Sequence, residues 1–159
     1  MEYLIRPAVA QDVPAMLGLI KELAEFEKEP DAVKIDEATL HKYGFGPEPI
    51  YHCFVAELDQ KVIGMALVYF KFSTWNGKSL YLEDLVVTGK MRGKGIGEAL
   101  LNKVVVFGKE NDVQRIGWVV LDWNHGAIKF YKQKGAVIQT NWNIAQLDKE
   151  AIANFNTNS

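Results

Sequence analysis

The chain has 159 residues, of which 48% are hydrophobic, and this is enough to bury the core of a single domain over residues 1–159 without disulfides or metals. Its 18 basic and 20 acidic residues give a net charge of −2, which argues against a nucleic-acid partner held by a basic surface. One cysteine, three histidines without zinc-site spacing and no apolar run near ~20 residues predict no disulfide, metal site or membrane span.

The first elements in the chain are a short strand and a helix. Residues 1–9 read as the strand and lack the layout of a signal peptide, so we expect a cytoplasmic protein. Asp12 is expected to cap the helix that follows. Glu27 lies seven positions after Ile20, which places it on the apolar stripe of this helix. The alternative is a frayed last turn with Glu27 in water.

The middle of the chain predicts a second helix and three strands. Asp36 caps this helix and Gly44 stops it. The strands form two hairpins, and Asn76-Gly77 is a strong turn signal in the second one. The strands are expected over residues 51–58, 62–72 and 79–87.

Two adjacent carboxylates, Glu83 and Asp84, lie in the middle of the third of these strands. Side chains of a regular strand alternate between its two faces. One face then presents Leu80, Leu82, Asp84 and Val86, and the other presents Tyr81, Glu83, Leu85 and Val87. We therefore expect the two carboxylates to point to opposite faces of the sheet.

The last part of the chain predicts alternating helices and strands. The expected helices cover residues 98–111 and 125–134, the latter closed by Gly135, and Asp148 caps a last short one. The expected strands are residues 115–122 and two weaker ones, around Val137 and over residues 142–147. The fold class is therefore α/β, in the form of an α+β mixed sheet with helices on both faces.

The strongest chemical signal is a glycine-rich loop between a strand and a helix. It reads Arg92-Gly93-Lys94-Gly95-Ile96-Gly97, and its backbone N–H groups can converge on an anion such as a pyrophosphate at the positive end of the helix. The glycine spacing fits neither a P-loop nor a dinucleotide fingerprint. The alternative is a tight turn without a ligand.

Arg-x-x-Gly-x-Gly after a strand resembles motif A of the GNAT acyltransferases, which holds the pyrophosphate of acetyl-coenzyme A. Further segments resemble the spermidine/spermine (diamine) acetyltransferases and their thialysine branch, and the similarity runs through nearly the whole chain. These segments are IRPA (5–8), LIKELAEFE (19–27), GFG (44–46), YHCFVAE (51–57), YLEDLVV (81–87), RGKGIG (92–97), WNHGAIKFYKQKGA (123–136) and LDKE (147–150).

The resemblance implies a GNAT fold, with a mostly antiparallel mixed sheet flanked by helices, and acetyl-coenzyme A as co-substrate. The expected coenzyme contacts are Leu85, Val86, Val87, Arg92, Gly93, Lys94, Gly95, Ile96, Gly97, Asn124 and Tyr131. The stretch from Leu85 to Val87 is expected to supply a backbone donor to the oxyanion, beside a bulge that splays two strands. No metal is expected.

Acetyl transfer to an amine needs a neutral nitrogen, although an alkylammonium has a pKa near ~10.4. Glu83 matches the general base of the resembled family and is expected to act through water, and Tyr131 matches its general acid, which protonates the departing thiolate. The structural alternatives are a Glu83 paired with a surface lysine and a Tyr131 packed in the core beside Phe130.

A cationic acceptor needs carboxylates and aromatic faces, and the candidates are Glu27, Glu83, Asp84, Trp75 and Trp142. The alternative for the tryptophans is ordinary packing. Three departures from the resembled family argue against strict polyamine specificity: Gly18 replaces an arginine, Ser73 replaces an acidic residue, and the segment before Trp142 is shortened to residues 139–141.

These observations predict an N-acetyltransferase that acts on the primary amine of a small cationic metabolite, such as a diamine or polyamine, in a ternary complex. Thialysine, or a protein N-terminus, is the alternative acceptor, and a non-catalytic acyl-coenzyme A sensor is the alternative of another class. A homodimer is expected from the resemblance alone. Cys53 is expected to be a small core residue rather than a nucleophile.

Overall fold

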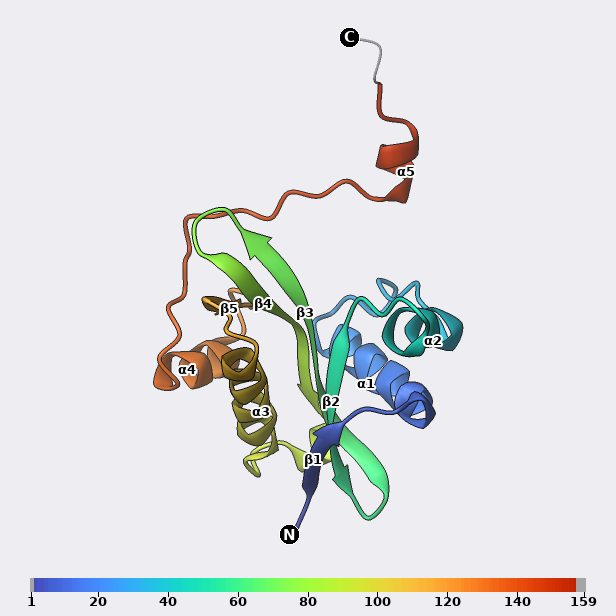
Figure 1. The fold of residues 1–159 in the computed structure, drawn as a ribbon, viewed down its shortest axis with the longest axis vertical. Coiled ribbons are helices and arrows are strands. Elements are labelled where there is room, and N and C mark those ends of the chain that lie inside the picture. The colour runs from blue at the N-terminus through green and yellow to red at the C-terminus, as the bar shows by residue number, and fades with distance from the viewer. Residues whose placement is uncertain (1, 157–159) are drawn as a thin grey trace. The chain divides into compact units, whose positions relative to one another are not determined.

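The computed structural model describes residues 2–156, which form two units that divide between Val119 and Val120 (Figure 1). The first unit contains a five-stranded sheet and three helices. The second contains two helices joined by a long connection. A single domain over the whole chain stays a prediction.

The sheet of the first unit has the strand order β1-β2-β3-β4-β5. Neighbouring strands are antiparallel except for β4 and β5, which are parallel. This confirms the mixed, mostly antiparallel sheet. The strands are β1 (Leu4–Pro7), β2 (His52–Leu58), β3 (Lys61–Ser73), β4 (Gly77–Val87) and β5 (Arg115–Gly117).

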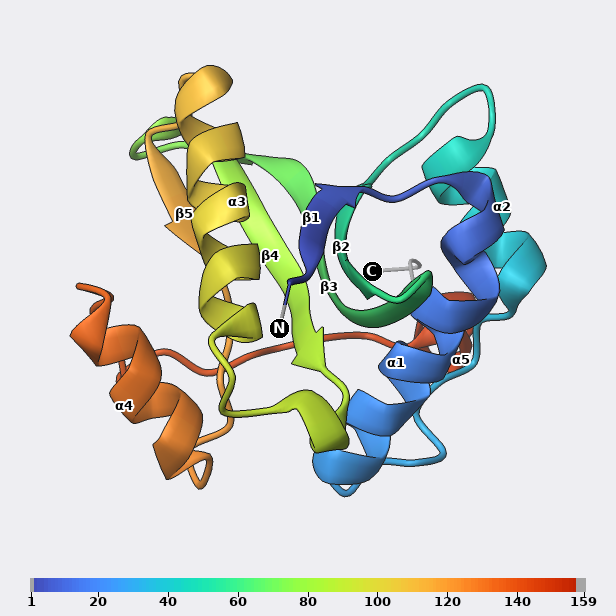
Figure 2. The same ribbon diagram turned by 90° about the horizontal axis from the view of Figure 1, so that it is seen from below.

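Helices cover both faces of this sheet. Helices α1 (Val13–Phe26) and α2 (Glu37–Phe45) lie on one side, and α3 (Ile96–Glu110) lies on the other (Figure 2). The core under α1 includes Met16, Met65 and Val86, each at most 2% exposed. The core under α3 includes Leu82, Leu100 and Val104, with the same degree of burial.

A β-bulge in β4 reverses the predicted direction of Asp84. Leu82 is paired with Val68 and Asp84 with Leu67, so Glu83 is an extra residue between the two pairs. Since Leu67 and Val68 are consecutive, they point to opposite faces, and so do Leu82 and Asp84. Asp84 therefore lies on the α1 face.

Glu83 reaches the same face, because its carboxylate accepts a hydrogen bond from Tyr69, which packs against the core under α1. The prediction that the two carboxylates point to opposite faces is therefore wrong. The physical reason is the extra residue, which shifts the alternation of side chains by one position.

The ends of the first two helices differ from the predictions in detail. Asp12 occupies the N-cap position of α1 but makes no capping bond to the helix, because its carboxylate is held by Arg6 at 2.7 and 2.9 Å and by the Val9 N–H at 2.8 Å. Asp36 caps α2 as predicted, with Thr39 N–H donating to it at 2.8 Å.

Gly44 does not stop α2, which continues to Phe45. A Cβ at position 44 would overlap the Tyr51 ring, whose hydroxyl donates to the Leu40 carbonyl at 2.7 Å. The glycine therefore allows α2 to pack closely on this tyrosine.

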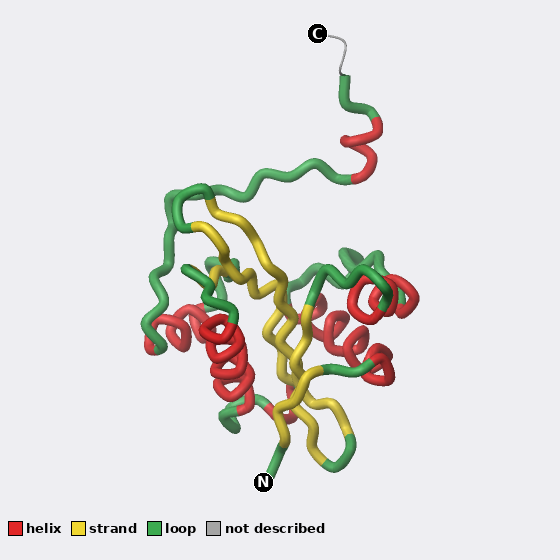
Figure 3. Tube along the Cα trace, viewed as in Figure 1, coloured by secondary structure: helices red, strands yellow, loops and turns green. Residues whose placement is uncertain are grey.

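The second unit contains α4 (His125–Gln133) and α5 (Lys149–Ala153), both at predicted positions. Asp148 caps α5, and Gly135 follows α4 with a φ of +89°. The strands predicted around Val137 and over residues 142–147 are wrong, since the described part of this unit contains no strand and the connection is a loop (Figure 3).

The strand predicted over residues 115–122 is also too long. Its pairing with β4 ends at the contact of Gly117 with Tyr81, two residues before the bulge. A segment with strand-forming residues becomes a strand only where its backbone pairs with a neighbouring strand. Residues 118–122, the stretch around Val137 and residues 142–147 have no such neighbour among the described residues of their own unit.

Candidate active site

The glycine-rich loop connects β4 to α3 and has the conformation that an anion site needs. Gly93 and Gly95 have φ values of +72° and +80°, which favour glycine, and Gly95 is the N-cap of α3. A Cβ at either position would meet nothing within 4 Å, so the space beside the loop is open.

The backbone amides of this loop are available to a ligand. Within the described residues, none of the N–H groups of residues 93–97 donates to a protein acceptor. The Ile96 side chain is 1% exposed and anchors the loop in the core. Free amides at the positive end of a 15-residue helix fit a diphosphate.

The Arg92 side chain points back to the end of β4 rather than over the loop. Its Nε donates to the Val87 carbonyl at 3.0 Å, and its guanidinium lies 4.8 Å from the centre of the Phe26 ring. The Lys94 ammonium contacts the Met91 sulfur at 3.7 Å. Coenzyme contacts of both side chains stay predictions.

Within the described residues, one edge of the second half of β4 pairs with no strand, and it is called the free edge below. β5 pairs with β4 only as far as Tyr81, whereas β3 pairs with it to the end. Thr88 N–H donates to the Ile63 carbonyl of β3 at 2.9 Å. Since alternate residues of a strand bond to the same neighbour, the amides of Leu85 and Val87 point to the free edge, whereas Val86 bonds to β3.

Three carboxylates converge on the α1 face beside this free edge. Burial, reinforced by the charges of Glu83 and Glu27, raises the pKa of Asp84 to about 6. Burial also raises the pKa of Glu27. The cluster of Glu27, Glu83 and Asp84 is called the acidic cluster below.

Two tyrosines complete the surroundings of the acidic cluster. The Tyr69 hydroxyl donates to Glu83 Oε2 at 3.2 Å, and its ring centre lies 5.2 Å from that of Tyr81. Burial and the charge of Glu83 raise the pKa of Tyr69 to about 12 and also raise that of Tyr81. Both hydroxyls therefore keep their protons at neutral pH.

The end of α1 holds Glu27 in a fixed turn. Lys28 N–H donates to the Glu25 carbonyl at 3.1 Å and Glu29 N–H to the Ala24 carbonyl at 2.9 Å, which is a Schellman motif with Lys28 at a φ of 64°. The helix end is thus closed rather than frayed. Glu27 as a whole residue is exposed, and the partial burial of its carboxylate is what raises the pKa of this group.

The two predicted tryptophans are exposed. Trp75 lies in the turn between β3 and β4 and is 81% exposed, and Trp142 of the second unit is 65% exposed. The Ser73 hydroxyl accepts hydrogen bonds from the N–H groups of Trp75 and Asn76, both at 3.2 Å. Ser73, where the resemblance implied an acid, therefore stabilises this turn.

The remaining predicted residues lie at α4 in the second unit. Asn124 is the N-cap of this helix and accepts the Ala127 N–H at 3.2 Å. Tyr131 lies in the helix with its ring centre 5.3 Å from that of Phe130. The coenzyme contact of Asn124 and the acid role of Tyr131 stay predictions.

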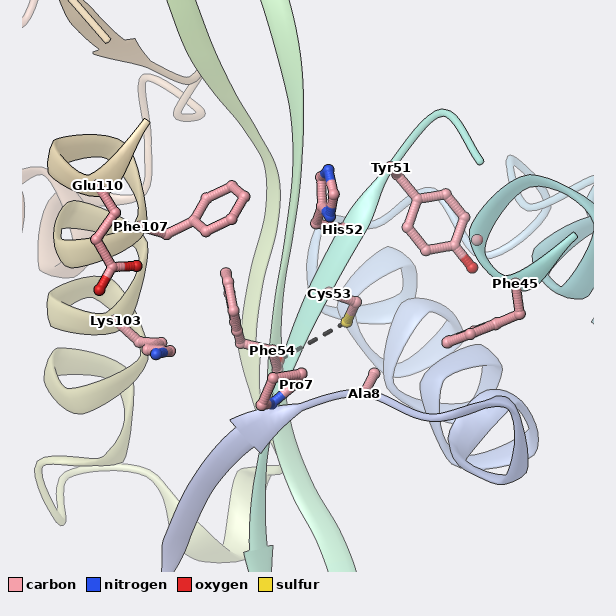
Figure 4. Close-up of a pocket in the computed structure, with 11 residues that line it drawn as sticks. Pro7, Ala8, Phe45, Tyr51, His52, Cys53, Phe54, Lys103, Phe107 and Glu110 are labelled. Carbon is pink, nitrogen blue, oxygen red and sulfur yellow. Dashed lines mark hydrogen bonds between the residues drawn. The ribbon is translucent and has the colours of Figure 1, made fainter. Parts of the chain in front are cut away.

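A pocket of about 420 Å³ lies elsewhere in the first unit and shares no residue with the loop or the acidic cluster (Figure 4). It is lined by the β2 residues His52, Cys53 and Phe54, together with residues of α2 and α3. Cys53 is buried, and burial raises the pKa of its thiol far above neutrality. This confirms the prediction that Cys53 is a small core residue.

The described residues 2–156 contain neither a metal-binding cluster nor a membrane-spanning helix. No group of three or more His, Cys, Asp and Glu side chains is arranged to hold a metal ion. Nor is any helix of this part long and apolar enough to cross a membrane.

A mostly antiparallel sheet in which β4 leads through a glycine-rich loop into a helix is the arrangement that the resemblance to the GNAT acyltransferases implied. The sequence matches the Acetyltransferase (GNAT) family over residues 16–136. The chain therefore belongs to the GNAT family and is an N-acetyltransferase, as the resemblance implied. GNAT acetyltransferases use acetyl-coenzyme A, and the free amides of the loop fit its diphosphate.

Two of the named relatives differ in the acceptor that their names give. The chain is 40% identical over 160 residues to thialysine N-epsilon-acetyltransferase of Bos taurus, covering 94% of each chain. It is 34% identical over 163 residues to spermidine/spermine N(1)-acetyltransferase-like protein 1 of Homo sapiens, covering 96% of this chain and 24% of that protein.

A solved structure shares the fold. An integron cassette protein of V. cholerae superposes with a TM-score of 0.77 at 24% identity, and the match covers 96% of each chain.

Proposed function

We propose that this protein transfers the acetyl group of acetyl-coenzyme A directly to the primary amine of a small cationic metabolite. The observation that carries the proposal is that one strand, β4, bears two carboxylates of the acidic cluster and leads into the glycine-rich loop. Three carboxylates attract an ammonium group, and the loop offers amides to a diphosphate.

Each step of the reaction falls to a particular group of this chain. The coenzyme supplies an acetyl group as a thioester. The amides of residues 93–97 hold the diphosphate, and the edge amides of Leu85 and Val87 are aimed to donate to the developing oxyanion. Glu83 removes the amine proton through water, and Tyr131 donates a proton to the leaving sulfur.

Thialysine, or a similar amino acid, is the acceptor that we favour over a polyamine. Ser73 and the shortened segment before Trp142 remove negative charge, which weakens binding of a long polycation more than that of an amino acid that brings its own carboxylate. The thialysine relative supports this order, and the spermidine/spermine relative keeps a diamine or polyamine as the second candidate.

We also propose that the chain acts as one domain and as a homodimer in the cytoplasm. The family match crosses the boundary between the two units at Val119, which supports the single domain. Light scattering during size-exclusion chromatography tests the dimer, and a mass of one chain would contradict it.

The proposed function is tested by measuring thiol release from acetyl-coenzyme A with thialysine, lysine, ornithine, putrescine, spermidine and spermine. We expect turnover with highest kcat/KM for thialysine, and a loss of about 100-fold or more in kcat for Glu83→Gln. A preference for spermidine would overturn the choice of acceptor. Coenzyme binding without turnover of any amine would overturn the proposed function.

A further inference from the structure

We propose that Glu22, on the helix α1, is a positioning residue that holds the coenzyme loop in its binding conformation. The proposal rests on the proposed function of the loop. Glu22 carries no local signal in the sequence, because the residues that it contacts follow more than 65 positions later.

The central contact is a hydrogen bond between Glu22 and the turn that precedes the loop. Gly89 N–H donates to Glu22 Oε1 at 2.6 Å, which is the short distance of a charge-assisted bond. The same oxygen lies 3.9 Å from Nη2 of Arg92. One carboxylate oxygen thus contacts both the start of the turn, at residues 89–91, and the first residue of the loop.

Phe26 supports the same arrangement from the next turn of α1. Residues 22 and 26 lie four apart, so they share one face of the helix. The Arg92 guanidinium lies over the Phe26 ring, while its Nε donates to the Val87 carbonyl. Arg92 is therefore held between α1 and the end of β4.

Between the described residues, no other hydrogen bond ties residues 89–95 to a distant segment. In the described residues, every other hydrogen bond of residues 89–95 is made within residues 87–99. Gly93 and Gly95 are left flexible by their lack of side chains. Beside the burial of Ile96 and the contacts of Arg92, the Glu22 contact is therefore the hydrogen bond that limits how far the turn, and the amides that follow it, can move from the sheet.

If only its charge mattered, Glu22 would weaken coenzyme binding rather than support it. A carboxylate near a diphosphate repels it, so removal of this charge would tighten coenzyme binding. The ion pair with Arg92 is long and lies at the surface, with side-chain exposures of 41% and 35%, and such pairs contribute little. The hydrogen bond is therefore the contact that matters, and glutamine can still accept it.

The experiment titrates coenzyme A into the wild type, Glu22→Ala, Glu22→Gln and Glu25→Ala by calorimetry. Glu25 lies on the same helix, is exposed and serves as the matched control. We expect Kd to rise about 10-fold for Glu22→Ala and to stay within about threefold for the other two. The KM for the amine is expected to stay unchanged, which a general loss of structure would not produce.

Amide hydrogen exchange gives a second readout that does not depend on the coenzyme. The Gly89 N–H is expected to exchange slowly in the wild type and in Glu22→Gln but faster in Glu22→Ala. Wild-type Kd or tighter binding in Glu22→Ala would overturn the inference, as would an equal loss in Glu25→Ala. Failure of the wild type to bind coenzyme A would instead overturn the proposed function.

Discussion

Asp84 and Glu83 are the residues at which stability and function oppose each other. Asp84 is half-buried, next to two other carboxylates, and no cation is paired with it in the described residues. An ionised carboxylate in such a place costs folding free energy, which raises its pKa. The same uncompensated charge is what a cationic acceptor would neutralise on binding.

Asp84→Asn is therefore predicted to stabilise the protein at neutral pH. The pKa of Asp84 is about 6 in the folded state and near ~3.9 in the unfolded state, so its contribution to stability is full below ~3.9 and is lost as pH rises through 6. Asparagine does not ionise, so the variant keeps this stability, and we expect its free energy of unfolding to exceed that of the wild type by about 2 kcal/mol at pH 7. Urea unfolding from pH 4 to pH 8 measures it.

The added stability of Asp84→Asn should disappear near pH 4, where the Asp84 carboxyl of the folded wild type is protonated. Asp59→Asn, at the exposed turn between β2 and β3, is the control and should change little at any pH. A difference between Asp84→Asn and wild type that is the same at all pH values would contradict the assigned pKa.

Tyr131→Phe tests the proton donor. Loss of the hydroxyl is expected to lower kcat by about 100-fold while leaving the affinity for coenzyme A within a few-fold, because only the acid is removed. An assay of thiol release measures kcat, and calorimetry measures the affinity for coenzyme A. Tyr43→Phe, on α2, is the control, and unchanged kcat in Tyr131→Phe would show that another group protonates the thiolate.

At the scale of elements, the predictions succeeded where the signal was local. Asp36, Asp148 and Gly135 lie at helix ends because their side chains, or the lack of one, satisfy the local backbone. The bulge at Glu83 has no such local signal. The resemblance implied a bulge beside Leu85 to Val87, but the position of the extra residue follows from the register with β3, which local sequence does not fix.

Gly44 shows how tertiary packing replaces a local rule. Gly44→Ala is expected to destabilise the protein by about 1–3 kcal/mol, since the new methyl group would overlap Tyr51. Gly18→Ala is the matched control, since position 18 of α1 is exposed and a Cβ there would meet nothing within 4 Å. This variant should stabilise the protein by up to about 1 kcal/mol. Chemical denaturation measures both, and equal effects would contradict the packing argument.

At the scale of the whole molecule, the sequence was sufficient for the family and the sheet but not for contacts between distant segments. The strand pattern predicted the two hairpins of β2, β3 and β4, and the resemblance implied a mostly antiparallel mixed sheet, whereas the order of the strands in the sheet was not predicted. The pairing of Glu22 with Gly89, and the convergence of Glu27 on Asp84, depend on how α1 packs on the sheet. Side-chain periodicity predicts that α1 packs, but not which loop its polar residues meet.

The proposed function depends above all on the binding of a diphosphate by the free amides of residues 93–97. The most direct measurement is a titration of isotope-labelled protein with coenzyme A, followed by amide NMR shifts. We expect the largest shifts at Gly93, Gly95 and Gly97, and small ones at Gly77, a glycine of similar φ in the hairpin turn. Saturable binding of coenzyme A that leaves the three loop glycines unshifted would contradict the account.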